Sequence, residues 1–141
     1  MKPDNIFLTT DEVPKVLDFG IAKFVRPASD SIALAATGAC LGTLGYMSPE
    51  QILGGTPHES WDLWALAVLT YEMLEGVHPF AETSTMQGAA VASGGFGVAV
   101  GRPDVPPSRR SLFTGAFSPD PAARPSSALA FLDSLERALD C

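Results

Sequence analysis

The sequence has few basic residues, few cysteines and no long apolar run. Its 141 residues include nine Lys and Arg against 16 Asp and Glu, which gives a formal net charge of -7. Binding to the phosphates of nucleic acid requires clustered basic side chains, so this balance argues against a nucleic-acid partner. The longest apolar stretch, residues 63–69, is far too short to span a bilayer. A membrane segment is therefore not expected in these residues.

The two cysteines, Cys40 and Cys141, fit no metal-binding spacing, and two thiols cannot form a framework of several disulfides. We expect both to be free thiols in a reducing compartment. The N-terminus shows no basic, apolar and cleavage-site pattern, which predicts no signal peptide. With 46% hydrophobic and 18% charged residues, the composition is that of a folded chain of about one domain. These features together predict a cytoplasmic globular protein.

The first part of the chain predicts a hairpin followed by a long loop. Two short apolar runs at 6–8 and 15–17 flank a polar segment with turn character, a pattern typical of a small β-hairpin. Residues 18–45 mix Gly, Ala, Ser, Thr and Pro without a sustained period, which predicts a loop. A loop of this length in a compact domain usually has a function.

The rest of the chain carries helical signals. Ser48 can cap a short helix, and the strongest helix is expected from Ser60 or Asp62 to about Glu75, where Gly76 ends it. The spacing of its apolar residues predicts that this helix is buried nearly all round. Further helices are predicted at 84–92, 109–117 and 125–139, the last with an apolar stripe of Leu129, Leu132, Leu135 and Leu139. The expected fold class is therefore mainly α, with one small N-terminal β-hairpin.

A short acidic motif follows the predicted hairpin. Asp18-Phe19-Gly20 begins thirteen residues after Asn5. Alone, this tripeptide could be a turn after a strand, with Phe19 in the core. With Lys2 and Asn5 just ahead of the hairpin, however, it places a carboxylate and an amide oxygen side by side. Mg²⁺ is a hard ion that prefers such oxygen ligands and leaves room for phosphate.

The opening residues 1–5 (MKPDN), the tripeptide at 18–20 and the later segment 46–50 (YMSPE) resemble the second half of a protein kinase catalytic domain. In that family, the Asn and the Asp of these motifs hold the metal ions that bridge the nucleotide phosphates. The resemblance implies that Asn5 and Asp18 are metal ligands and that Lys2 lies near the transferred phosphoryl group. It also implies ATP and Mg²⁺ as the cofactors of the intact family.

A second part of the resemblance concerns the peptide substrate. Gly42 and Thr43, followed by the motif at 46–50, are similar to the segment that holds the substrate beside the catalytic loop. Lys2 together with Thr43 resembles the serine/threonine type rather than the tyrosine type, although Thr43 could also bond its own backbone. Thr37 stands where bacterial kinases of this family often carry an activating phosphothreonine, and a solvated loop hydroxyl is the alternative.

Two further motifs imply structural roles. The segment 120–125 (DPAARP) resembles the loop before the last helix of the family, where an Arg pairs with the Glu of the Pro-Glu motif. This resemblance implies a buried two-point ion pair between Glu50 and Arg124, the alternative being two surface charges. In the motif 62–67 (DLWALA), the family uses Asp62 to receive N–H bonds from the catalytic loop. The alternative is an ordinary acid at a helix N-terminus.

Packing roles are expected for several other side chains. Trp61 and Trp64 are more typical of a core than of a ligand site, and the isolated His58 and His78 argue against a catalytic histidine. The helix that covers one side of the central helix in the family is missing from the sequence. We therefore expect an exposed apolar patch on the central helix, formed by Leu63, Leu66 and Leu69.

Several parts of a complete kinase domain are not among these residues. The Asp that accepts the proton of the substrate hydroxyl would precede Met1, and the sequence contains neither a Gly-rich loop nor a strand Lys with its partner Glu. We therefore expect a truncated kinase domain that is inactive alone. Residues 1–17 are expected to be the end of the catalytic loop and the hairpin, 18–50 the activation segment and 51–141 the helical lobe.

Two hypotheses about function follow. In the first, the chain is part of a serine/threonine protein kinase that transfers phosphoryl groups from ATP, and its partners are a protein substrate or a separate N-lobe. In the second, it is a non-catalytic kinase-like lobe that binds another protein through its helical surface. The first hypothesis is favoured by the four ordered motifs, and the second by the expected apolar patch.

Overall fold

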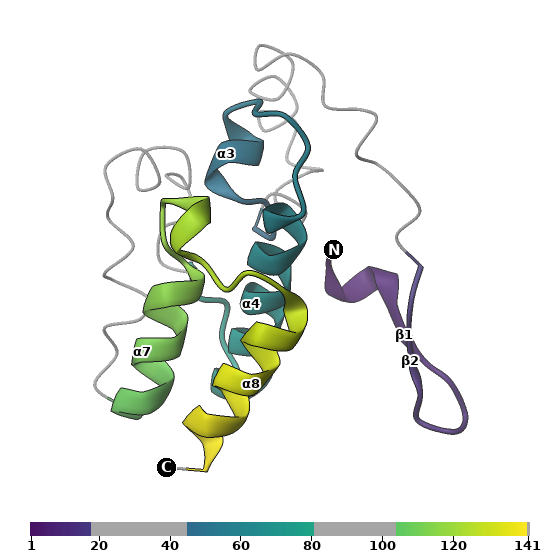
Figure 1. Cartoon of the computed structure of the whole chain (residues 1–141). Helices are drawn as coiled ribbons and strands as arrows, with labels where there is room; N and C mark the ends of the chain where they lie inside the picture. The colour runs from purple at the N-terminus through teal and green to yellow at the C-terminus, as the bar shows by residue number, and fades with distance from the viewer. Residues whose placement is uncertain (18–44, 81–103, 141) are drawn as a thin grey trace.

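The computed structural model describes residues 1–17, 45–80 and 104–140 (Figure 1). The described residues are mostly helical and include one small antiparallel sheet, which confirms the predicted fold class. The helix predicted at 84–92 and nearly all of the loop predicted at 18–45 lie outside these residues. The elements are η1 (Pro3–Asn5), β1 (Ile6–Leu8), β2 (Pro14–Val16), α3 (Pro49–Ile52), α4 (Ser60–Glu75), α7 (Pro107–Ala116), η4 (Pro121–Ala123) and α8 (Ala128–Leu139).

Strands β1 and β2 form the predicted hairpin, with the second strand one residue earlier than expected. Ile6 lies opposite Val16 in the antiparallel register. The turn is closed at Thr9, whose backbone N–H donates to the Val13 carbonyl at 3.0 Å and whose hydroxyl accepts from the Val13 N–H at 3.1 Å. The hairpin lies to one side of the helices (Figure 1), and Leu8 is 72% exposed.

Helix α4 spans the residues predicted for the central helix. It ends at Gly76, which has a left-handed φ of 68° and donates its N–H to the Glu72 carbonyl at 2.9 Å. A residue with a side chain is strained at this φ, so glycine suits the position. Trp61 and Trp64 are buried, as predicted. Burial covers most of the helix circumference, and Met73, at 84% exposure, marks the open side.

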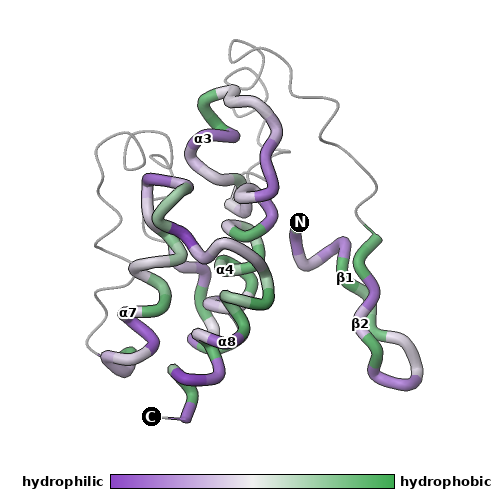
Figure 2. The backbone as a smooth tube through the Cα atoms, viewed as in Figure 1, coloured by the Kyte–Doolittle hydropathy of each residue, from purple (hydrophilic) through white to green (hydrophobic). Residues whose placement is uncertain are grey.

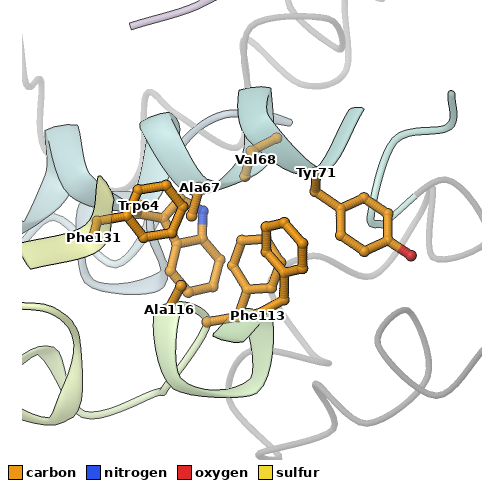
Figure 3. Close-up of a cluster of buried hydrophobic side chains, with 8 residues drawn as sticks. Trp64, Ala67, Val68, Tyr71, Phe113, Ala116 and Phe131 are labelled. Atoms are coloured by element: carbon orange, nitrogen blue, oxygen red, sulfur yellow. The ribbon is translucent and has the colours of Figure 1, made fainter. Parts of the chain in front are cut away.

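The core lies between α4, α7 and α8 (Figure 3). Its centre is aromatic: the ring centroids of Tyr71 and Phe113 are 4.9 Å apart in an edge-to-face contact. Phe113 also stacks on Phe117 at 5.8 Å. Such ring pairs add to the stabilisation from apolar burial. The buried cluster consists of Trp64, Ala67, Val68, Tyr71, Phe113, Ala116, Phe117 and Phe131.

The exposed leucine patch predicted on α4 is wrong. Leu69 is only 7% exposed, and Leu66 packs against the core cluster, while Leu63 is half-buried. Leu69 lies one turn after the buried Ala65, and residues four apart share a helix face. This part of α4 is therefore covered by the chain's own side chains.

Helix α8 (Ala128–Leu139) is capped by Ser127, one of the two residues predicted to start it. The Ser127 hydroxyl accepts the N–H of Ala130 at 3.1 Å. The leucine stripe does not form the buried face, however, because Leu129 is 73% exposed. Phe131 and Ala138, seven residues apart, are the buried residues of this helix.

Figure 2 shows how apolar and polar residues alternate along α8 and the other elements. Within the described ranges, no helix is long and apolar enough to cross a bilayer.

Candidate functional site

The structure brings Glu50 and Arg124 together in a two-point ion pair. Arg124 donates from Nη1 to Oε1 of Glu50 at 2.7 Å and from Nη2 to Oε2 at 2.8 Å. Its Nε donates to the Ser118 carbonyl at 2.9 Å, and its guanidinium lies 4.8 Å from the centroid of the Trp64 ring. The Arg124 side chain is fully buried, whereas the Glu50 side chain is 24% exposed. This geometry matches the planar fork of arginine to a carboxylate.

The pair fixes the position of the short helix α3. Burial by itself raises the pKa of the Glu50 carboxyl, but the hydrogen bonds and charge of Arg124, with further bonds from the Glu50 backbone and Ser48, hold that pKa below its usual value. Arg124 also donates to the Ser60 carbonyl at the start of α4, at 3.4 Å. Because one guanidinium contacts α3, the start of α4 and the segment before α8, these three parts are held together.

Helix α3 is also fixed by its own ends. Ser48 is completely buried and accepts the Gln51 N–H at 3.3 Å, which is the capping role expected for it. Gly55 donates its N–H to the Glu50 carbonyl at 2.8 Å, and a Cβ at Gly55 would meet that same oxygen at 2.8 Å. The close approach leaves no room for a side chain at this glycine, so the backbone around Glu50 is tightly specified.

A second cluster, formed by Tyr46, Glu72 and His78, was not predicted from the sequence. The Tyr46 hydroxyl donates to Oε2 of Glu72 at 2.6 Å. The ring centroids of Tyr46 and His78 are 5.6 Å apart, and the two rings are nearly perpendicular. Burial, followed by the hydrogen bond and charge of Glu72, raises the pKa of the Tyr46 phenol far above its usual value. Tyr46 therefore stays neutral and ties the segment before α3 to the C-terminal half of α4.

Replacing Tyr46 with Phe is expected to destabilise the fold by about 1.5 kcal/mol or more, the usual contribution of a hydrogen bond to a charged group. The ring and its contact with His78 are retained, so the change isolates the bond to Glu72. Urea unfolding at pH 7 measures the difference. Glu72→Gln, which keeps an acceptor oxygen for the Tyr46 hydroxyl, is expected to lose less stability than Tyr46→Phe. Equal stability of Tyr46→Phe and the unchanged chain would contradict a stabilising role of the Tyr46–Glu72 bond.

The residues predicted to hold metal lie at the start of the chain. Asn5 ends η1, and its carbonyl accepts the Leu17 N–H at 2.8 Å, so the hairpin brings Leu17 beside Asn5. Asp18 is the next residue in the sequence but lies outside the described residues. Nζ of Lys2 is 3.3 Å from Oδ2 of Asp4. In the described part of the chain, no cluster of three or more His, Cys, Asp or Glu could hold a metal ion.

The remaining predicted residues are placed as follows. Asp62 lies in the first turn of α4 and is exposed, where its charge favours the helix N-terminus. Thr37 and Thr43 lie outside the described residues. Of the predicted residues, Glu50 and Arg124 are thus the two that the structure brings into direct contact. The metal-binding and substrate-binding assignments stay predictions.

Comparisons with known proteins all point to one family. Residues 1–134 match the family model for the protein kinase domain. The chain is 36% identical to serine/threonine-protein kinase pkn3 of Myxococcus xanthus, over 96% of this chain and 26% of that protein. It is 34% identical to serine/threonine-protein kinase PknL of Mycobacterium tuberculosis, over 96% of this chain and 34% of that protein. It is also 36% identical to serine/threonine-protein kinase A of Synechocystis, over 99% of this chain and 27% of that protein. The chain therefore spans about a quarter to a third of these relatives.

Proposed function

This chain belongs to the protein kinase domain family, in its bacterial serine/threonine type, and we propose that it supplies the metal-binding and peptide-binding part of such a kinase. The reaction of the complete domain is the transfer of the terminal phosphoryl group of ATP to a Ser or Thr hydroxyl of a protein. The observation that carries the proposal is the match of residues 1–134 to the kinase domain, with its motifs in order.

The described geometry supports this proposal at the peptide side. The Glu50–Arg124 pair and the Tyr46–Glu72 bond anchor the segment that follows Thr43, at 2.7 Å and 2.6 Å respectively. Catalysis of phosphoryl transfer depends mainly on positioning and on charge stabilisation, so a rigid support for the peptide segment is what the reaction requires. We assign 1–17 to the catalytic loop and hairpin, 18–50 to the activation segment and 51–141 to the helical lobe.

The proposal assigns Mg²⁺ to Asn5 and Asp18. Their amide and carboxylate oxygens fit a hard divalent cation, and the bond between Asn5 and Leu17 keeps the two ends of the hairpin together. When bound with ATP, the metal supplies positive charge to the phosphate oxygens. Lys2 contributes a further positive charge near the transferred group. Thr43 contributes to binding of the peptide, and Thr37 is the proposed site of phosphorylation.

The 141-residue chain by itself is expected to show no phosphoryl transfer. These residues include no Gly-rich loop, no strand Lys with a partner Glu and no proton-accepting Asp of the family type, and the reaction uses these groups together. Incubation with labelled ATP, Mg²⁺ and a Ser- and Thr-rich test protein measures the transfer. Label that enters the test protein, and that is lost in Asp18→Asn, would contradict the expectation of inactivity.

A second candidate function is a non-catalytic lobe that binds another protein. Exposed leucines on α8, with Leu129 at 73% and Leu139 at 51% exposure, favour this alternative. It predicts that Leu129→Ser and Leu139→Ser weaken a definite protein complex. The kinase proposal instead predicts that function depends on Asn5 and Asp18.

A further inference from the structure

His78 follows α4 and is half-buried between two aromatic rings. Its ring centroid lies 5.6 Å from that of Tyr46, in an edge-to-face arrangement, and 5.8 Å from that of Phe80. Nδ1 of His78 accepts the backbone N–H of Phe80 at 3.1 Å. A ring nitrogen that accepts a hydrogen bond carries no proton, so this contact requires a neutral ring with its hydrogen on Nε2.

Protonation would remove this contact. A proton on Nδ1 turns the acceptor into a donor, and it would then point at the Phe80 N–H, which is also a donor. The partly buried Phe80 packs against the core with its ring, which stacks on Trp64 at 5.7 Å and meets Phe117 at 5.2 Å between ring centroids. The turn from His78 to Phe80 therefore joins a titratable group directly to the edge of the core.

The groups around His78 act on its charge in opposite directions. Burial disfavours the charged ring and is the largest effect, while Glu72 on α4 and the Gly45 carbonyl favour it, and the pKa of His78 lies below its usual value. Tyr46, from the segment before α3, is the titratable group in ring contact. Glu72 already accepts the Tyr46 hydroxyl at 2.6 Å, so a charged His78 would compete with Tyr46 for this carboxylate.

We propose that His78 is a pH-sensitive latch. When neutral, it holds Tyr46 beside the C-terminal part of α4 and Phe80 in its stack on Trp64, and when protonated, it releases both. Tyr46 lies two residues before Ser48, which caps α3, so the release acts on the support of the proposed peptide-binding segment. The effect on peptide binding rests on the proposed function, whereas the latch is a property of the fold and is tested without phosphoryl transfer.

The chain contains a matched control for His78. It has two histidines, and Nδ1 of His58 accepts the N–H of Ser60 at 3.1 Å, the same contact to the second following residue. His58 is exposed, unlike the half-buried His78, and its Nδ1 also lies 3.0 Å from the Ser60 hydroxyl. Asn can accept the same N–H through its side-chain oxygen but does not titrate. His78→Asn and His58→Asn thus remove one titration each and retain the turn.

The test is urea unfolding of the 141-residue chain between pH 8 and 5.5. A folded-state pKa below the ordinary histidine value of about 6.5 gives stability that is present above that value and lost as the pH falls. The unfolding equilibrium constant of the unchanged chain and of His58→Asn should rise by up to about tenfold per pH unit below about 6.5. His78→Asn should lose most of this slope. An unchanged slope in His78→Asn would overturn the proposal.

Nuclear magnetic resonance of the unchanged chain gives a second test that requires no variant. The ¹⁵N shifts of His78 should show an unprotonated Nδ1 at pH 8, and His78 should titrate below the ordinary histidine value of about 6.5. Exchange of the Phe80 amide hydrogen should accelerate as His78 titrates. A His78 that titrates at or above about 6.5, or a Phe80 amide whose exchange does not follow it, would overturn the latch.

Discussion

Replacing Arg124 with Met is expected to destabilise the fold by about 3 kcal/mol, the lower end of the range for removing one partner of a buried ion pair. Methionine fills similar space, so the loss comes from the charge and its hydrogen bonds rather than from a cavity. Glu50 would keep its carboxylate without the two bonds at 2.7 and 2.8 Å, and the Ser118 carbonyl would lose its donor. The 24% exposure of Glu50 limits the penalty. Urea unfolding at pH 7 measures it.

Two variants separate the pair from a general effect of losing positive charge. Arg137, on the exposed side of α8, donates to the Ser134 hydroxyl, and Arg137→Met should change stability by about 0.5 kcal/mol or less. Arg124→Lys keeps the charge but loses the two-point geometry, so it should fall between the unchanged chain and Arg124→Met. Equal stability of Arg124→Met and Arg137→Met would contradict the role of the pair.

Lowering the pH should reduce the difference in the free energy of unfolding between the unchanged chain and Arg124→Met. The pKa of Glu50 is lower in the folded state than its usual value, so its contribution is present above that usual value and is lost as the pH falls through the folded-state pKa. This acid range lies below the usual Glu value of 4.5, outside the range of pH 8 to 5.5 used to test His78. The two pH effects can therefore be measured separately in one set of unfolding curves.

Replacing Phe113 with Ala is expected to cost about 3–5 kcal/mol, the usual range for truncating a buried aromatic side chain. Phe113 is completely buried, and its ring contacts those of Tyr71 at 4.9 Å and Phe117 at 5.8 Å. These contacts join α7 to α4, so truncation leaves a cavity at the centre of the core (Figure 3). The loss should appear as a lower urea midpoint with an unchanged denaturant slope.

Leu129→Ala is the control for Phe113→Ala. It removes apolar atoms from α8 at a position that is 73% exposed, so stability should change by about 0.5 kcal/mol or less. A loss in Leu129→Ala as large as that in Phe113→Ala would mean that the leucine stripe, rather than the aromatic cluster, holds the helices together. That outcome would contradict the described packing.

The local structure was largely predictable because its causes are local. Turn residues between apolar runs marked the hairpin, and helical spacing that ends at Gly76 marked α4. Ser48 and Ser127 cap the helices that they were expected to start. The leucine stripe of α8 misled because periodicity shows that one face is apolar but not whether it is buried. The aromatic ring of Phe131 fills the core instead.

The site was predictable only in part. Glu50 and Arg124 are 74 residues apart, and only the resemblance of two motifs indicated their pairing. The contact of Tyr46 with Glu72 carries no such signal, because it depends on how the segment before α3 lies on α4. His78 was expected only to pack, and its accepting Nδ1 became visible once the position of the Phe80 N–H was known. Asp18, Thr37 and Thr43 lie outside the described residues, and their roles stay predictions.

Phosphoryl transfer by a fusion protein tests whether this chain supplies the metal-binding part of a protein kinase. The amino-terminal half of a related serine/threonine kinase domain, up to and including its proton-accepting Asp, would be joined directly ahead of Met1, which keeps the spacing from that Asp to Asn5. The fusion is expected to transfer phosphate from ATP to Ser or Thr. Asn5→Ala and Asp18→Asn should each reduce the rate by on the order of 100-fold or more, the scale of losing one group that stabilises transition-state charge.

Asp11→Asn is the matched control, since Asp11 is an exposed acid in the hairpin turn. We expect an active fusion, an active Asp11→Asn variant and strongly impaired Asn5→Ala and Asp18→Asn variants. A folded fusion that stays inactive, or one whose activity is the same in Asp18→Asn as in Asp11→Asn, would contradict the claim that this chain supplies the metal-binding part of a protein kinase.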